Sequence, residues 1–388
     1  MQEQDTVNDD LYDNGAQAIE VIEDEKDDSY SNDDLYNINS WGADLSFREL
    51  ITMYQEDELQ KPELQRNYVW DKVEASRFID SLLLGLPVPS IFLANTSDET
   101  KLIIDGFQRI MTVYDYVTGL WSKDRKIFKL SDSKKINSRW RGLAFSELAP
   151  SEQRKIKATT IHAIIFEQTS PENDDDTSLY QIFERINTGG RSLMAQEIRN
   201  CVYQGKLNKL LIELNKNEHW RNLFGLTDPD ARMRDMEFIL RGLALNTSEI
   251  KNHDSGNISL KKLLNEFMGS KINNQEHNIE NFKHDFISTI TFIHDVIGTD
   301  AFFNIVLSDP PKIRRRFYPT IFDAVYVATS IALKSGKKID TTNLEYKRLE
   351  LLANPKFRSH ITSGTMQIEN IHGRISMVLE SLYGITYK

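Results

Sequence analysis

An abrupt change of hydrophobic period in residues 101–117, "KLIIDGFQRIMTVYDYV", constrains the fold more than any other feature of this 388-residue sequence. The apolar run Leu102–Ile104 stops at Asp105 and Gly106, and apolar side chains then recur at helical spacing. The pattern predicts a strand that passes directly into a helix. Such a junction leaves N–H groups of the first helical turn without partners and points the positive end of the helix dipole outward, which suits a phosphate.

Two interpretations of "DGFQR", residues 105–109, follow from the residues themselves. Asp105 and Gln108 have the spacing of a capping box, which would satisfy the same N–H groups internally. Alternatively, Gln108 and Arg109 project from the polar side of the helix towards a bound anion, and Gly106 lets that ligand approach the backbone. Spacing by itself favours capping, and both interpretations stay open at this point.

The remaining segments before residue 200 alternate between strand and helix patterns, whereas nearly every periodic segment after Ser192 is helical. Asp71 and Glu74 form a capping-box spacing, and Gly85 ends the helix that follows. Strands are predicted at 90–94, 101–105 and 159–168, and helices at 72–85, 107–118, 178–186, 232–245, 259–268, 281–297 and 368–384. The fold class is therefore α/β in the α+β sense, a small mixed sheet with helices followed by a mostly α-helical domain.

Acidic residues are concentrated at the N-terminus. Residues 1–40 contain 13 Asp and Glu against one Lys, which leaves 45 acidic and 46 basic residues in 41–388. A segment so acidic and so poor in large apolar side chains predicts a disordered tail over residues 1–38. The tail would either solubilise the protein or mimic nucleic acid, covering a basic surface or recruiting a partner. The expected domains are this tail, an α/β domain at 39–200 and a helical domain at 201–388.

Composition excludes several other classes of protein. One cysteine, Cys201, allows neither an internal disulfide nor a multi-cysteine zinc site and fits a reducing compartment. The N-terminus lacks the pattern of a secretory signal, and the longest apolar stretch, 82–94, is too short for a membrane span. We therefore expect a cytoplasmic protein without a membrane partner. The eight histidines are scattered, no H-E-x-x-H or G-x-x-x-x-G-K-[ST] motif occurs, and no metal site is predicted.

Three further segments carry candidate binding residues. In "LQRNYVWDK" an amide, a guanidinium and a phenol could meet a nucleotide, with Trp70 as a stacking surface, or the aromatic residues could simply cover the sheet. In "INTGGR" a glycine loop between two helices would expose N–H groups to a ligand, or serve only an αα-hairpin. In "KIRRRF" four cations could contact a DNA backbone, or form a solvated cluster. The cations are Lys312, Arg314, Arg315 and Arg316.

Three segments in order, "ELQRNYVWDKVEASRFIDSLLLGLPVPSIFLA", "IIDGFQRIMTVYDYV" and "FERINTGGRSLMAQEIRN", resemble the N-terminal domain of GmrSD-type restriction enzymes, a family that includes GmrS and SspE. The resemblance spans roughly residues 45–245 and implies a core similar to the ParB/sulfiredoxin fold. It also implies a nucleotide-binding pocket, linked to NTP hydrolysis that controls a DNA-cleaving partner in anti-phage defence. The expected cofactors are an NTP of unassigned identity and Mg²⁺.

Carried over by position, the resemblance assigns three catalytic residues and a larger nucleotide-binding set. The catalytic residues are Asp105, Gln108 and Arg109. The nucleotide-binding residues are Gln65, Arg66, Tyr68, Gly106, Asn187, Thr188, Gly189, Gly190 and Arg191.

Two departures from the family limit this transfer. Phe107 stands where sulfiredoxin-like motifs carry the reactive cysteine, so a sulfiredoxin-type reductase is excluded. No histidine motif of an HNH nuclease follows residue 245, so the nuclease is a separate protein or this member does not cleave by that route. Two rivals to an NTPase remain: a DNA-binding or DNA-sensing ParB-like protein, and a catalytically silent scaffold for a nuclease. The sequence leaves the oligomeric state open.

Overall fold

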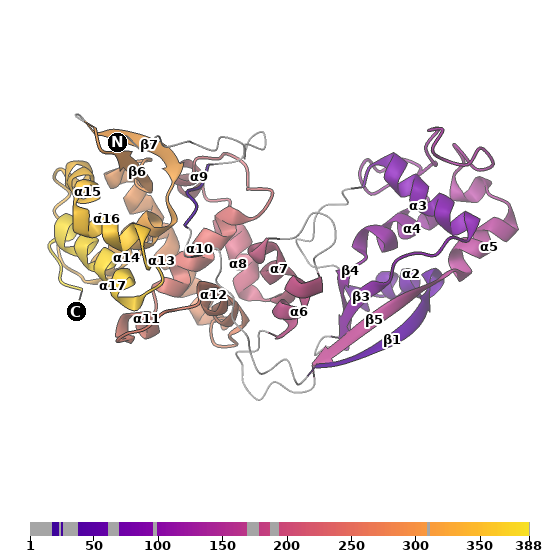
Figure 1. The fold of residues 1–388 in the computed structure, drawn as a ribbon, viewed down its shortest axis with the longest axis horizontal. Coiled ribbons are helices and arrows are strands. Elements are labelled where there is room, and N and C mark those ends of the chain that lie inside the picture. Colours follow the sequence, from indigo (N-terminus) through magenta and orange to yellow (C-terminus); the bar gives the residue numbers. More distant parts are fainter. Residues whose placement is uncertain are drawn as a thin grey trace, which may run out of the picture. The chain divides into compact units, whose positions relative to one another are not determined.

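The computed structural model describes residues 18–22, 25, 38–60, 70–95, 99–168, 178–186, 194–308 and 311–387. The chain forms two compact units, each of which is described by itself (Figure 1). An α/β unit comprises Asn32–Leu193 and Glu197–Gln204, and a helical unit comprises Met1–Ser31, Met194–Gln196 and Gly205–Lys388. The predicted fold class, a mixed sheet with helices followed by a mostly helical region, is confirmed.

A five-stranded mixed sheet in the order β1-β5-β3-β4-β2 organises the α/β unit. Its strands are β1 (Ile38–Ser46), β2 (Leu59–Gln60), β3 (Ile91–Asn95), β4 (Lys101–Asp105) and β5 (Thr160–Gln168). The pairs β1–β5 and β3–β4 are antiparallel, whereas β3–β5 and β2–β4 are parallel. The three predicted strands form within one residue of the expected ranges. The strand β1 escaped prediction because polar residues and Gly42 interrupt its apolar alternation.

Helices cover both faces of the sheet, as the alternation of side chains along β4 requires. Ile103 packs into a core with α2 (Phe47–Gln55), α3 (Lys72–Leu84), α4 (Phe107–Thr118) and α5 (Pro150–Ala158). Leu102 and Ile104 face the other way and pack with residues of α6 (Ser178–Ile186) and α7 (Ala195–Val202). The two cores fix where β4 ends and therefore where α4 begins.

The capping box predicted for α3 is formed. The Asp71 carboxylate accepts hydrogen bonds from the N–H groups of Val73 (2.7 Å) and Glu74 (2.8 Å), and Glu74 accepts one from the Asp71 N–H (2.8 Å). Gly85 follows the helix in the left-handed conformation, with φ of 79°. The start and the end of this helix were therefore both readable from the sequence.

The helical unit surrounds one largely apolar helix, α14 (Pro319–Lys334), most of whose residues are buried. Aromatic side chains of other elements, including Trp220 and Phe317, pack against Phe322 of this helix. The other helices are α8 (Lys206–Leu214), α9 (Glu218–Phe224), α10 (Arg234–Leu245), α11 (Ser248–Asn252), α12 (Leu260–Gly269), α13 (Glu276–Phe292), α15 (Leu344–Ala353), α16 (Pro355–Thr362) and α17 (Ile368–Val378). Each helix predicted in this region is present.

Two short segments continue helices as π-helical turns, η3 (Ile293–Ile297) after α13 and η4 (Leu379–Tyr383) after α17. A hairpin of β6 (Phe303–Val306) and β7 (Lys312–Phe317) interrupts the helices. The basic segment "KIRRRF" is thus a strand, for which its sequence carried no hydrophobic pattern.

The N-terminal segment is only in part what its composition predicts. The Phe317 N–H donates to Ala18 O (2.9 Å), and the Glu20 N–H donates to Phe317 O (2.8 Å), so this segment lies beside the end of β7. Ile22 is buried, with 7% of its surface exposed. Residues 18–22 thus make defined contacts although the composition of residues 1–38 predicts disorder, because Ala18 and Glu20 bond to β7 and Ile22 enters the core.

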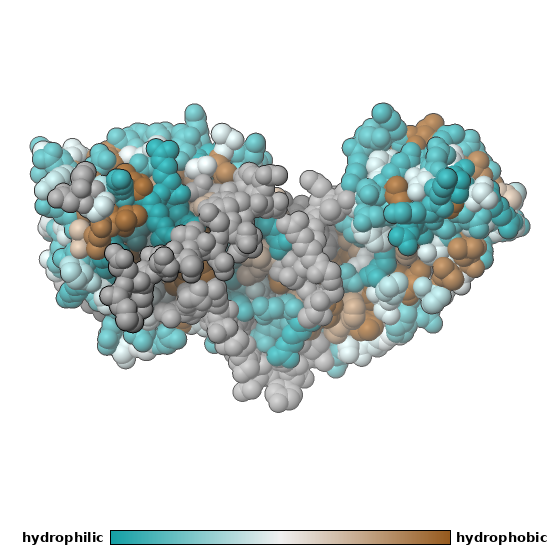
Figure 2. Space-filling model, turned by 45° about the horizontal axis from the view of Figure 1, so that its top comes forward, coloured by the Kyte–Doolittle hydropathy of each residue, from teal (hydrophilic) through white to brown (hydrophobic). Residues whose placement is uncertain are grey.

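Hydrophilic residues cover most of the visible surface of both units, with hydrophobic residues in scattered patches (Figure 2). Among the helices in the described ranges, none combines the length and the hydrophobicity needed to span a membrane.

Candidate functional site

The predicted junction is formed: β4 ends at Asp105 and α4 begins at Phe107, with Gly106 between them. Gly106 is the N-cap residue of α4 and has φ of 102°, a left-handed conformation that L-residues rarely adopt. A glycine has no side chain that could cap the helix, and no side-chain cap hydrogen bond is made there. The chain therefore turns sharply from strand to helix, and no N-cap side chain bonds the first N–H groups of α4.

The capping-box interpretation of Asp105 and Gln108 is wrong. The Asp105 carboxylate accepts a hydrogen bond from Nη2 of Arg109 at 2.5 Å, and Oε1 of Gln108 accepts one from the Trp70 N–H at 3.3 Å. The reason is a shift of one residue: the N-cap position falls on Gly106, so Asp105 precedes the position from which a capping side chain reaches the N–H groups.

Arg109 and Asp105 differ in how far they are enclosed. The Arg109 side chain is 13% exposed, whereas the Asp105 side chain is 55% exposed. Their ion pair has the i,i+4 spacing of neighbours on a helix, and solvent screens its exposed partner, so the attraction is modest. The guanidinium is thus held in place by a carboxylate that another anion could replace.

Gly106 is required by packing inside the unit. A Cβ atom at this position would lie 2.3 Å from Cγ2 and 2.9 Å from Cβ of Ile91, which is buried in β3. We expected a ligand to approach the backbone closely at Gly106, but in the structure the side chain of Ile91 lies against it. The backbone at the start of α4 is accordingly fixed by the sheet before any ligand arrives.

The second candidate segment reaches the junction through Trp70. This residue is partly buried, packs on the core of the α/β unit, and places its ring 5.6 Å from that of Phe78 in an edge-to-face arrangement. The aromatic part of "LQRNYVWDK" therefore serves the core at this position. The assigned residues Gln65, Arg66 and Tyr68 lie outside the described residues.

The glycine loop that follows α6 also lies outside the described residues. The loop residues in question are Asn187, Thr188, Gly189, Gly190 and Arg191. In α7, just beyond, Glu197 and Arg199 are buried, and the Arg199 guanidinium lies over the ring of Tyr180 at 5.7 Å. Cys201 is buried in the same core, and burial raises the pKa of its thiol, so it has no thiolate character.

The basic residues Lys312, Arg314, Arg315 and Arg316 lie on β7 in the helical unit. Glu20 of the N-terminal segment pairs with Nη1 of Arg316 at 3.1 Å and with Nη1 of Arg314 at 3.6 Å. The sequence suggested that the acidic segment could cover a basic surface but did not indicate which basic segment. The structure brings them together.

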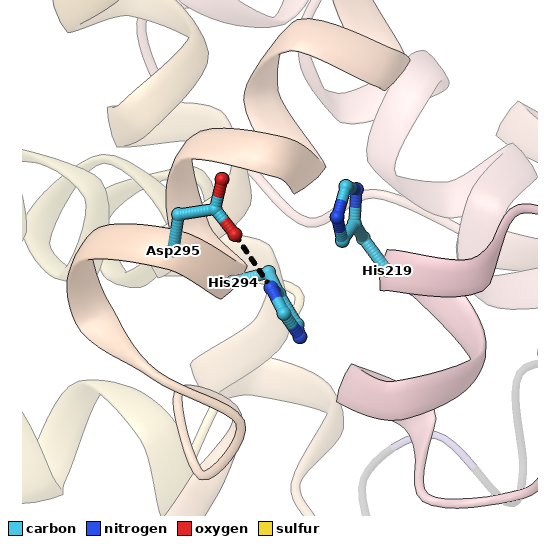
Figure 3. Close-up of side chains that lie close together, drawn as sticks. All are labelled: His219, His294 and Asp295. Atoms are coloured by element: carbon cyan, nitrogen blue, oxygen red, sulfur yellow. Dashed lines mark hydrogen bonds and ion pairs between the residues drawn. The ribbon is translucent and has the colours of Figure 1, made fainter.

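A further cluster, His219, His294 and Asp295, lies in the helical unit and was missed from the sequence (Figure 3). The sequence shows only that His294 and Asp295 are neighbours, because His219 belongs to α9, far away in the chain. His219 and His294 are far apart in the sequence, but the fold places their ring centroids 4.6 Å apart.

Residues 47–204 match the family described as "GmrSD restriction endonuclease, N-terminal domain". A comparison with curated proteins gave no match. The matched range begins at α2 and extends through α7, and so corresponds to the α/β unit without β1. This part of the α/β unit is thus similar to an N-terminal domain of restriction endonucleases. More particularly, residues 47–204 belong to the GmrSD N-terminal domain family, which confirms the resemblance. Membership indicates a role in a restriction system. Such a role suggests DNA and a nuclease as partners.

Proposed function

We propose that the α/β unit binds an NTP at the junction of β4 and α4, and that hydrolysis there regulates DNA cleavage by a separate nuclease. The observation that carries the proposal is the start of α4, where no N-cap side chain bonds the first turn and the enclosed guanidinium of Arg109 lies alongside. This arrangement offers a phosphate both N–H donors and a fixed positive charge.

The Asp105–Arg109 pair suits a site that exchanges anions. Without a ligand, Asp105 neutralises the guanidinium and holds it near the helix start. A phosphate group carries more charge than one carboxylate and can accept two parallel N–H bonds, so it competes well for Arg109. Asp105, released and half-exposed, is then free to hold Mg²⁺ through water, which offsets its repulsion of the phosphates.

Gln108 is the residue that would orient the attacking water. The hydrogen bond from the Trp70 N–H to Oε1 fixes the side-chain amide at the first turn of α4. A positioned amide can align a water without being a base itself. Arg109 thus binds the phosphate, Asp105 holds Mg²⁺ through water, and Gln108 orients the attacking water.

The test measures phosphate release from ATP, GTP, CTP and UTP with Mg²⁺ for the wild type and for Arg109→Ala. We expect the variant to lose at least tenfold in turnover with the preferred NTP. Arg139→Ala is the matched control, since Arg139 also pairs with a carboxylate, that of Glu152 at 3.1 Å, but is 71% exposed and lies outside the junction. Equal turnover of wild type and Arg109→Ala would overturn the assignment, and calorimetry without any NTP binding would favour a silent scaffold.

One observation favours a second function, DNA binding by β7 under the control of the acidic segment. Glu20 occupies Arg314 and Arg316, two of the cations that a DNA backbone would contact. The variant Glu20→Gln should bind duplex DNA more tightly and with a steeper salt dependence, because the Glu20 carboxylate no longer competes with phosphates for Arg314 and Arg316. The matched control is Glu218→Gln, a glutamate at the start of α9. Affinity that does not change in Glu20→Gln rules this function out.

A further inference from the structure

The helical unit contains a group of side chains whose chemistry is separate from the nucleotide proposal. His219 comes from α9, and His294 and Asp295 come from the π-helical turn η3 (Figure 3). One possible ligand atom from each residue lies within 4.8 Å of the other two. We propose that these three residues bind a divalent transition-metal ion, with Zn²⁺ as the type case.

The donor set determines the class of metal. Two imidazole nitrogens and one carboxylate oxygen are ligands of Zn²⁺ and its first-row neighbours, whereas Ca²⁺ and Mg²⁺ prefer oxygen alone. Ligand atoms around tetrahedral Zn²⁺ are separated by roughly 3–3.5 Å, given bonds of about 2.0–2.2 Å. The three ligand atoms, which lie within 4.8 Å of one another, therefore have to move closer by side-chain rotation when the ion binds. Three protein ligands leave one coordination position open for water or substrate.

The hydrogen bonds of the cluster already orient the two rings. Nδ1 of His294 lies 2.7 Å from Oδ1 of Asp295, and Nδ1 of His219 lies 3.2 Å from the Thr291 hydroxyl. A proton shared by the first pair occupies the place of an ion, so metal binding replaces one hydrogen bond by two metal bonds and displaces that proton from Nδ1. The Thr291 hydroxyl can accept the Nδ1 proton of His219, which leaves Nε2 of that ring as the ligand.

Asn222 supplies a partner for the other nitrogen of His294. Its Nδ2 lies 3.5 Å from Nε2 of His294. When Nδ1 binds the ion, Nε2 carries the proton, and rotation of the Asn222 amide presents its oxygen as the acceptor. An outer hydrogen bond of this kind is what metal-binding histidines usually have.

The cluster is also accessible. The His294 side chain is 23% exposed and the Asp295 side chain 54%. Thr291 and Asp295 also line a cavity of about 690 Å³, so the cluster has open space on the side of Asp295. The turn η3 is π-helical, with more residues per turn than an α-helix, so His294 and Asp295 point in more similar directions; such turns are frequent at functional sites.

The same helix offers an internal comparison. His284 and Asp285 repeat the His-Asp dipeptide on α13, but their Nδ1 and Oδ1 atoms are 3.7 Å apart, His284 is 82% exposed, and Asp285 pairs with Lys334. Among the described residues, the His219 group is the one set of three such side chains close enough to share an ion. His284 therefore controls for the nonspecific affinity of a surface histidine.

The test is a calorimetric titration of the full, chelator-treated protein with ZnCl₂, and of His219→Ala, Asp295→Asn and His284→Ala. We expect one ion per chain in the wild type and in His284→Ala, and a loss of at least tenfold in affinity in the other two variants. Addition of CoCl₂ should give visible absorption bands of a low-coordinate site in the wild type and not in His219→Ala.

Asp295→Asn keeps the test valid if His219→Ala fails to fold, because the exposed carboxylate is replaced by a side chain of nearly equal shape. Far-ultraviolet circular dichroism of the metal-free variants checks their folding. The proposal is overturned if the wild type binds no Zn²⁺, or if folded Asp295→Asn binds it as tightly, or if His284→Ala weakens binding as much as His219→Ala.

Discussion

Gly106 is held at its position by two independent constraints, one from its backbone and one from its neighbour. Its φ of 102° disfavours any L-residue, and a Cβ atom would collide with the buried side chain of Ile91. Gly119, at the other end of the same helix, shares only the first constraint: its φ is 89°, and nothing lies within 4 Å of an added Cβ. The two glycines therefore allow strain and collision to be separated.

The expected destabilisation differs accordingly between Gly106→Ala and Gly119→Ala. Left-handed strain costs roughly 1–2 kcal/mol in either variant, and overpacking adds about 1–3 kcal/mol at Gly106 alone. Urea unfolding followed by fluorescence measures both free energies of unfolding. Equal losses in the two variants would mean that Ile91 moves aside freely, in which case the start of α4 is not fixed by β3.

The candidate site could be located from the sequence, but its contacts could not. The change of period at Asp105 and Gly106 placed the junction within a residue, since strand and helix patterns are local. The partner of Asp105 was missed because capping is counted from the N-cap residue, and the positive φ of Gly106 shifted that position by one. His219 was missed for a different reason: its contact with His294 depends on the packing of α9 against η3.

At the scale of elements, the period of the hydrophobic residues predicted the long helices and the inner strands. It did not predict elements whose formation depends on partners elsewhere in the fold. The basic strand β7 is polar along most of its length and exists because β6 pairs with it on one side and residues 18–20 lie beside its end. No local pattern in "KIRRRF" indicates those partners. The same holds for the apolar residues within the acidic N-terminal segment.

The N-terminal segment also completes a buried ion cluster, which makes its removal testable. Nη1 and Nη2 of Arg241 donate to the Glu25 carboxylate at 2.7 and 2.8 Å, and the same guanidinium donates to Asp323. Asp323 is shared with Arg374, and all of these side chains are mostly buried. Asp323 and Glu25 outweigh the effect of burial and raise the pKa of Arg241, so this residue stays charged.

The effect of N-terminal truncation on stability should therefore increase sharply once residues 18–25 are removed. Removing residues 1–17 should leave the free energy of unfolding nearly unchanged, because the contacts of residues 18–22 and of Glu25 persist. Removing residues 1–31 should cost roughly 3 kcal/mol or more, since it uncovers the core at Ile22 and leaves the buried Arg241 without Glu25. Thermal and urea unfolding of both truncated proteins measure the difference. A gradual loss spread over both truncations would contradict this assignment of the stabilising contacts.

At the scale of the whole molecule, the chain combines two units with separate cores. The core of the α/β unit is built on β3, β4 and β5, and the aromatic core of the helical unit surrounds α14. The family match ends at residue 204, close to the start of the helical unit. The two proposed ligands accordingly fall on different units, an NTP on the first and a metal ion on the second.

This division predicts that each ligand stabilises one unit. A ligand at 100 times its Kd adds about 2.7 kcal/mol to the unit that binds it and nothing to a unit that does not. Scanning calorimetry of the full protein should show two transitions, of which a non-hydrolysable NTP with Mg²⁺ raises one and Zn²⁺ raises the other. Arg109→Ala should abolish the first shift alone and Asp295→Asn the second alone. A single transition that both ligands raise equally would show instead that the two cores unfold as one, so that nucleotide and metal binding are coupled through the stability of the whole chain.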